Sequence, residues 1–235
     1  MMQRLNRFAT LFLLVACGAA LADDVPESWD GLVEVKAKRM DAVFLMPGAD
    51  FRQYTKVMVD PTEVAFRKDW MKSINEDRTN PTRRVTEQDA AEILAAARSN
   101  FDDIFREAFE KAGYPVVTAP GPEVLRVATA VINLYLNAPD TLSPGRTRSY
   151  TANAGEATLV IEVRDSSTGA LLGRVLDRRE TSDNAGYMQV ANSVTNLADF
   201  RMLFKQWATT TTKGLEELKA HSPVPEDLKP KQKLN

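Results

Sequence analysis

Five charged residues in two groups are the side chains best suited to bind an acidic or polar ligand. The first group lies in a long connection rich in Pro, Gly, Ser and Thr, and the second continues a run of alternating strand residues. The candidates are Arg146, Arg148, Asp177, Arg178 and Arg179. Arginine donates several N–H bonds in a planar fork that matches a carboxylate or phosphate, so the two groups together could hold such a ligand. Otherwise they would be a solvated loop and a charged strand edge.

Catalysis has little chemical support in this sequence. The chain holds one Cys, Cys17, and one His, His221, which excludes a disulfide framework, a Cys–His zinc cluster and a Ser-His-Asp or Cys-His site. No paired carboxylates stand out by their spacing. The acidic turn at 165–169 has a structural explanation, because Asp165 can form an Asx turn and Gly169 can adopt a positive φ. We therefore expect no enzyme, no metal and no cofactor.

The balance of charges argues against nucleic acid as a partner. The 235 residues include 30 basic and 32 acidic side chains, with a formal net charge of −2. A protein whose main task is to bind phosphate backbones carries an excess of basic residues. We expect no nucleic-acid partner.

The N-terminus has the pattern of an export signal. Arg4 and Arg7 precede an apolar run over 8–16 that is too short to span a bilayer. No other stretch of the sequence is apolar for long enough to cross a membrane. We therefore expect the mature protein to be exported to the periplasm.

Two processing sites compete at the end of this signal. The residues before Cys17 resemble a bacterial lipobox, which makes Cys17 a lipidation candidate, whereas Ala20-Leu21-Ala22 has the small-x-small pattern of ordinary signal-peptidase cleavage. The signal peptide is thus 1–22, or 1–16 if Cys17 is lipidated. In the second case, a lipid on Cys17 would be the protein's contact with the membrane and would anchor it to the outer membrane.

The mature chain is long enough for one sizeable hydrophobic core. With 44% hydrophobic and 26% charged residues, its composition is that of an ordinary globular domain. We expect a leader over 23–30, a single domain over 31–220 and a disordered tail over 221–235, since that tail is rich in Pro and Lys and poor in large apolar residues.

Two long amphipathic helices are predicted in this domain. The first spans 86–112: Thr86 and Asp89 resemble a capping box, apolar residues follow at helical spacing, and Gly113 is a stop signal. The second spans 197–218. We expect both helices to pack on the same face of a sheet.

The remaining periodic segments predict strands. The run 124–136 is apolar on both faces, which is typical of a central strand covered on both sides. A β-hairpin follows, with its turn at 165–169, and Asp60-Pro61 interrupts an earlier strand near a sheet edge. The predicted fold class is α+β: a single two-layer domain with a mainly antiparallel or mixed β-sheet and two long helices, in the order ββαβββα.

The order of these motifs resembles that of a bacterial family of lipoproteins, domain of unknown function 3313. The resemblance covers most of 31–218 and rests on these features: Tyr54-x-x-Val57-x-Val59-Asp60-Pro61, the mid-chain helix, Leu159 to Asp165 with Thr168-Gly169, Asp177-Arg178-Arg179, and the terminal helix with Phe204 and Trp207-Ala208. It implies an exported, often lipidated envelope protein of a Gram-negative bacterium, with no established activity and no catalytic residues to transfer.

Two classes of function are compatible with these observations. The first is a non-catalytic interaction module that binds an envelope protein or cell-wall component through the long connections 67–85 and 138–155. The alternative is a periplasmic small-ligand-binding protein or hydrolase that uses the five charged candidates. A deep pocket holding several of these residues would favour the alternative, and a filled sandwich with exposed loops would favour the module.

Overall fold

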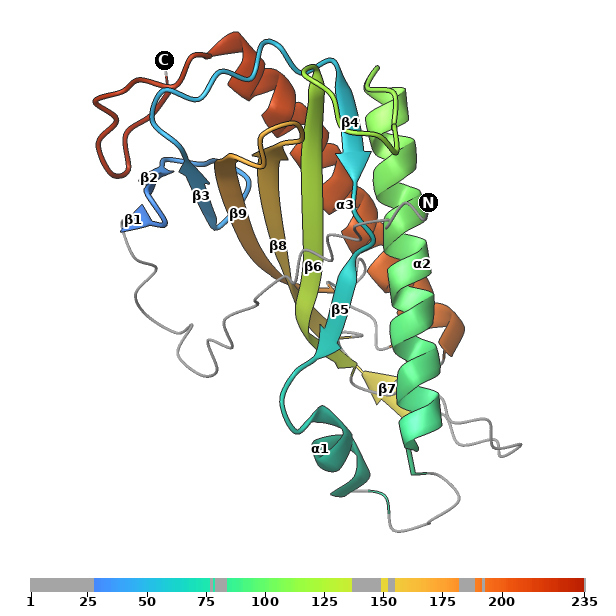
Figure 1. Cartoon of the computed structure of the whole chain (residues 1–235). Helices are drawn as coiled ribbons and strands as arrows, with labels where there is room; N and C mark the ends of the chain where they lie inside the picture. Colours follow the sequence, from blue (N-terminus) through green and yellow to red (C-terminus); the bar gives the residue numbers. More distant parts are fainter. Residues whose placement is uncertain are drawn as a thin grey trace, which may run out of the picture.

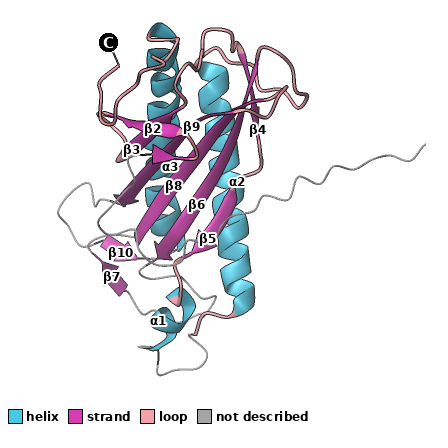
Figure 2. Ribbon diagram, turned by 60° about the vertical axis from the view of Figure 1, so that its left-hand side comes forward, coloured by secondary structure: helices cyan, strands magenta, loops and turns pink. Residues whose placement is uncertain are grey.

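A mixed β-sheet with two long helices packed on one face is the framework of the protein (Figure 1). The computed structural model describes residues 28–76, 78, 84–136, 149–151, 155–181, 189–191 and 193–234. Figure 2 shows both long helices on the same side of the strands. The predicted α+β class is confirmed.

The main sheet has eight strands in the order β1-β2-β3-β9-β8-β6-β4, and β5 also pairs with β6. Its strands are β1 (Ser28–Trp29), β2 (Leu32–Val35), β3 (Ala42–Leu45), β4 (Lys56–Val59), β5 (Glu63–Phe66), β6 (Val124–Leu136), β8 (Gly155–Asp165) and β9 (Leu171–Glu180). A separate two-stranded sheet joins β7 (Ser149–Thr151) to β10 (Gln189–Ala191). The helices are α1 (Trp70–Glu76), α2 (Glu87–Lys111) and α3 (Ser193–Ala220).

Strand β6 is central, as its length and composition predict. It pairs with β8 in antiparallel fashion on one side and with β4 and β5 in parallel on the other. The predicted interruption at Asp60-Pro61 falls between β4 and β5. Burial on both faces of β6 was a wrong expectation: Val127 and Val131 are buried under the helices, but Ala128 and Ala130 on the other face are partly exposed because no described helix covers it.

Helix α2 begins with the predicted capping box. The Thr86 hydroxyl accepts a hydrogen bond from the Asp89 backbone N–H at 3.2 Å, and the Asp89 carboxylate accepts one from the Thr86 N–H at 2.8 Å. The helix ends before Gly113, whose φ of 87° favours glycine. Its buried stripe includes Phe101 and Phe105, so local signals define both ends and the inward face.

Helix α3 shares one core with α2. It starts four residues earlier than predicted, at Ser193 instead of 197. The rings of Phe101 and Phe204 meet edge to face, with centroids 5.1 Å apart, and Phe204 stacks on Trp207. Both helices and the inward side chains of the sheet belong to the same buried cluster, which confirms that the helices pack on one face.

The disordered tail predicted for 221–235 is wrong for 221–234, the part that the structure describes. Val224 and Leu228 are buried, and Val224 exchanges two backbone hydrogen bonds with Gly48 and Ala49, at 3.0 and 2.8 Å. Further on, Gln232 lies parallel to Val35 of β2. Two apolar side chains and a set of backbone partners therefore order a segment whose composition is that of a disordered one. The predicted leader 23–30 also ends in a strand, β1.

We expect Phe101→Ala and Trp207→Ala each to lower the free energy of unfolding by about 3–5 kcal/mol, because both side chains are fully buried between the helices and the sheet. Urea unfolding followed by circular dichroism measures this. The control is Arg98→Ala on the exposed face of α2, which should change stability by no more than about 0.5 kcal/mol. Losses near zero at both aromatic positions would show that the two helices do not depend on this core.

Candidate functional site

A cavity of about 550 Å³ lies between the C-terminal half of α3 and the helix-covered face of the sheet. Its wall is mostly apolar and comes from α2, α3 and five strands. The apolar lining includes Val35, Val43, Leu45, Phe51, Phe109, Leu125, Val127, Ile161, Val163, Val175, Leu215 and Leu218. Because the lining contains both fully buried Phe51 and exposed Lys36, the cavity extends from the core to the surface.

The mouth of the cavity is basic. Four cationic side chains, which we call the basic rim, line it: Lys36, Lys38, Arg39 and Lys233. Exposed His221 lies among the same lining residues, and Glu217 is the acidic residue among them. Glu217 lies 3.8 Å from the Arg39 guanidinium, and both side chains are mostly exposed. The cavity thus combines an apolar interior with a positively charged entrance.

Small residues on α3 leave room for this cavity. Thr210, Thr211 and Gly214 all line it. The two threonine hydroxyls donate to the carbonyl oxygens of Gln206 and Trp207, each at 2.8 Å, so their polar atoms are satisfied within the helix. A Cβ placed at Gly214 would have no heavy atom within 4 Å outside its chain neighbours and its own helix. A glycine in a helix interior lowers stability by about 1 kcal/mol relative to alanine. At position 214 the missing side chain leaves space at the cavity.

Three of the charged candidates from the sequence, Asp177, Arg178 and Arg179, line one shallow hollow, but each is bonded to neighbouring residues. Arg146 and Arg148 lie outside the described residues. Asp177 is only 3% exposed, and its carboxylate accepts bonds from Trp207 Nε1 at 2.7 Å, Arg179 Nε at 2.6 Å and the Asp41 N–H at 3.0 Å. Three donors occupy a buried carboxylate, so Asp177 and Arg179 hold the structure together instead of facing a ligand.

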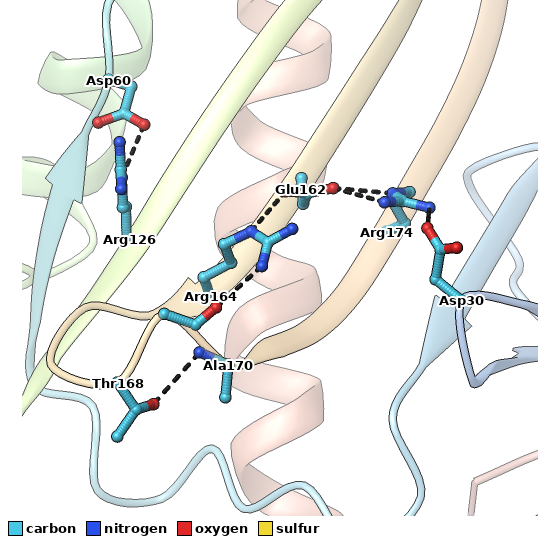
Figure 3. A network of polar contacts seen from close by, with 9 residues as sticks. Asp30, Asp60, Arg126, Glu162, Arg164, Thr168, Ala170 and Arg174 are labelled. Atoms are coloured by element: carbon cyan, nitrogen blue, oxygen red, sulfur yellow. Dashed lines mark hydrogen bonds and ion pairs between the residues drawn. The ribbon is translucent and has the colours of Figure 1, made fainter. Parts of the chain in front are cut away.

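Arg178 belongs to a set of ion pairs on the sheet face that the helices leave uncovered. Its guanidinium donates to Glu156 at 2.7 Å, and Arg67 donates to the other oxygen of the same carboxylate at 3.1 Å. Farther along the sheet, Glu162 bridges two arginines on neighbouring positions, and Arg126 pairs with Asp60 at 2.8 Å (Figure 3). Cross-strand charge pairs of this kind stabilise an exposed sheet face.

The bridge at Glu162 extends to the N-terminal hairpin. Glu162 accepts from Arg164 Nε at 2.6 Å and from Arg174 Nη2 at 2.7 Å, and Arg174 also donates to Asp30 at 2.8 Å (Figure 3). The nearby turn is structural, as predicted: Asp165 accepts from the Thr168 N–H at 2.7 Å, and Gly169 has a φ of 73°. These contacts explain the charges of the hairpin without a ligand.

The described residues offer few groups for acid–base or metal chemistry. They contain no group of three or more His, Cys, Asp or Glu that could hold a metal ion. Burial raises the pKa of Tyr54 to about 12, so its hydroxyl stays protonated and donates to Asp165 at 2.9 Å. Burial also raises the pKa of Tyr114, which donates to Glu216. Neither tyrosine would supply a phenolate at neutral pH.

None of the described helices has the length and apolar composition needed to cross a bilayer.

Sequence reasoning missed the basic rim and the cavity. Lys36, Lys38 and Arg39 follow one another closely in a connection between two short strands, which is a visible cluster of bases. Lys233 is far away in the sequence, and backbone hydrogen bonds such as that from the Lys36 N–H to the Gln232 carbonyl, at 2.9 Å, bring its segment to the same place. The cluster could have been noticed, but its position at a cavity mouth could not.

We expect Asp177→Asn to lower the free energy of unfolding by about 1–3 kcal/mol, because an amide cannot accept from all three donors and leaves Arg179 without its anion. Thermal and urea unfolding measure the change. Asp103→Asn, on an exposed part of α2, is the matched control and should stay within about 0.5 kcal/mol of the parent. Unchanged stability of the Asp177 variant would contradict the structural role.

Several solved structures resemble this chain at low identity. Protein XCC0632 from Xanthomonas campestris, of the DUF330 family, is 14% identical with a TM-score of 0.40, covering 80% of this chain and 94% of that one. A PelC dodecamer from Paraburkholderia phytofirmans is 12% identical with a TM-score of 0.35, covering 71% and 96%. A neuraminyllactose-binding hemagglutinin homolog from Helicobacter pylori is 11% identical with a TM-score of 0.33, covering 75% and 92%. Likeness at this level establishes no shared activity or assembly.

The family of the chain follows from its sequence. No curated protein matches it. A family model does match residues 22–211, which include the strands of the main sheet, α2 and most of α3. The chain therefore belongs to the family described as "Protein of unknown function (DUF3313)".

Proposed function

We propose that this protein is an exported, non-catalytic protein of the cell envelope that binds an apolar molecule in the cavity under α3. The observation that carries the proposal is the cavity of about 550 Å³ with its apolar wall and its opening at the surface. Ligand sites of soluble proteins are typically concave, mostly apolar and on the order of 300–1,000 Å³. The cavity fits this description in size and in lining.

The packing of the rest of the core supports a binding role for this space. Protein interiors are close-packed, and the side chains that line a large cavity lose van der Waals contacts. The neighbouring part of the core is filled by large aromatic side chains, among them Phe101, Phe105 and Phe204, which are almost completely buried. Gly214 lines the cavity, where an added Cβ would meet no heavy atom within 4 Å and would also favour the helix. A ligand would replace the missing contacts.

This proposal keeps the small-ligand-binding class that was the alternative from the sequence, but it places the site elsewhere and without hydrolysis. Asp177, Arg178 and Arg179 pair with neighbouring residues, so they do not form a polar binding site. The connection 138–155, which we expected to recognise an envelope protein or cell-wall component, lies largely outside the described residues. The cavity favours a small molecule with an apolar part, held by shape and burial and without a catalytic group.

Export is supported by the N-terminal sequence. The bases Arg4 and Arg7, the apolar run 8–16 and two processing signals stand before the part of the chain that forms the fold. In the periplasm, the protein would meet lipids, lipid precursors and other amphiphilic molecules, for which an apolar cavity is suited. Cys17, if lipidated, would keep the cavity close to the outer membrane.

We expect Gly214→Leu to weaken binding of phenylnaphthylamine, a neutral fluorescent probe, by at least about tenfold, because the new side chain fills the cavity. Thermal stability should stay the same or rise, since leucine favours the helix and meets no backbone. Gly214→Ala is the matched control: it adds helix propensity but leaves most of the space, so the probe should still bind. Equal binding of the probe by the leucine variant would show that the cavity is not the site.

We expect mass spectrometry of the protein isolated from its cells to find a new N-terminus, either a lipid-modified Cys17 or Asp23. A Cys17→Ser variant separates the two outcomes. It should remain unprocessed if the lipobox is used, and it should be cleaved normally if processing follows Ala22. An intact Met1 on the functional protein would contradict export.

A further inference from the structure

We infer that the natural occupant of the cavity is a single-chain anionic amphiphile, whose apolar chain lies under α3 and whose carboxylate, phosphate or sulfate lies at the basic rim. The inference rests on the proposed function and goes further by naming the class of ligand. It depends on three observations: the place of the rim, the excess of bases over acids around it, and the continuation of this basic excess beyond it.

The rim is built by two segments that the fold brings together. Lys36, Lys38 and Arg39 belong to the connection between β2 and β3, and Lys233 belongs to the C-terminal segment. Two backbone hydrogen bonds join these segments, from Lys36 N to Gln232 O at 2.9 Å and from Lys231 N to Glu34 O at 2.8 Å. Backbone pairing therefore fixes the main chain of both rim segments, while the four cationic side chains remain exposed to solvent around the mouth.

Within the described residues, three of the four rim cations have no carboxylate at ion-pair distance. Lys36, Lys38 and Lys233 form no ion pair there, and Arg39 has the long 3.8 Å contact with Glu217. The uncovered face of the sheet is different, because Arg126, Arg164, Arg174 and Arg178 each contact an acidic side chain at 2.8 Å or less. The fold thus neutralises its cations on one face and leaves a group of them unneutralised at the cavity mouth.

The basic surface continues past the mouth along α3. Arg39 also lines a shallow hollow with Arg179, Lys205, Gln206 and Lys213, of about 380 Å³. A second shallow hollow beside it is lined by Lys38, Arg39, Arg178 and Arg179 together with two acidic residues, Asp41 and Asp177. Bases outnumber acids in both hollows, and an excess of one charge beside a low-dielectric wall attracts an oppositely charged group. An anionic headgroup would thus be attracted to the mouth that admits its chain.

The geometry also argues against other occupants. A cationic amphiphile would place its charge among four like charges, which costs energy. A neutral apolar molecule would fill the cavity but would gain nothing from the rim. An amphiphile with an anionic head gains from both regions, and its head keeps contact with water, so full desolvation of a charge is avoided.

Displacement of bound phenylnaphthylamine by three decyl compounds, each below its micelle concentration, tests the inference. Decyl phosphate is expected to displace the probe at a concentration about tenfold lower than decanol or decyltrimethylammonium. This advantage should shrink as salt rises from about 50 to 300 mM, because salt screens exposed charges. Equal potency of the three compounds would overturn the inference and leave the cavity proposal standing.

A charge-reversed variant locates the effect. The double variant Lys36→Glu/Lys38→Glu should lose the preference for decyl phosphate, by about tenfold, and should still bind the neutral probe. The matched control is Lys68→Glu/Arg98→Glu, which makes the same change of net charge at two exposed sites. Lys68 lies just before α1, and Arg98 lies on α2. If the control loses the preference equally, net charge and not the rim is responsible, and the inference is wrong. If the parent protein binds neither probe nor amphiphile, the proposed function itself fails.

Discussion

One buried carboxylate sets the position of α3 on the sheet. A charge removed from water must be paired, and Asp177 is paired by donors from three places: Trp207 of α3, Arg179 of its own strand, and the backbone of Asp41. Asp41 in turn accepts from the Arg178 N–H at 2.8 Å, which fixes the end of the connection that carries the basic rim. The roof of the cavity and its entrance are thus held by the same small network.

The parts of the fold that the sequence predicts well are those specified by neighbouring residues. The capping box at Thr86, the long apolar run of β6 and the Asp165–Gly169 turn are such local signals, and each lies where we expected it. The ordered C-terminal segment could not be predicted, because Val224 and Leu228 are buried by residues that are distant in the sequence. The cavity depends on the same kind of distant contact.

Asp177 was recognised as a notable residue but was given the wrong role. Its register opposite Leu159, on the inward face of β8, places it under the helix. The sequence contains both the alternation that turns Asp177 inward and the Trp207 on the apolar stripe of α3, but not the evidence that these two meet. A buried acid that satisfies an indole N–H is easily taken for a ligand-binding group when its partner is unknown.

Helix α3 is fastened on both sides of the stretch that covers the cavity. Trp207 is bound to Asp177 on one side, and on the other Lys219 Nζ donates to the Tyr54 carbonyl at 3.0 Å. Between them, threonine hydroxyls bond to backbone carbonyls, an arrangement that bends helices, and Gly214 adds no stiffness. The part of α3 that covers the cavity is therefore held at both ends, with few stiffening features between them. For the proposed amphiphile, small bends in this helix would accommodate chains of different shape, and discrimination among ligands would fall to the charged entrance.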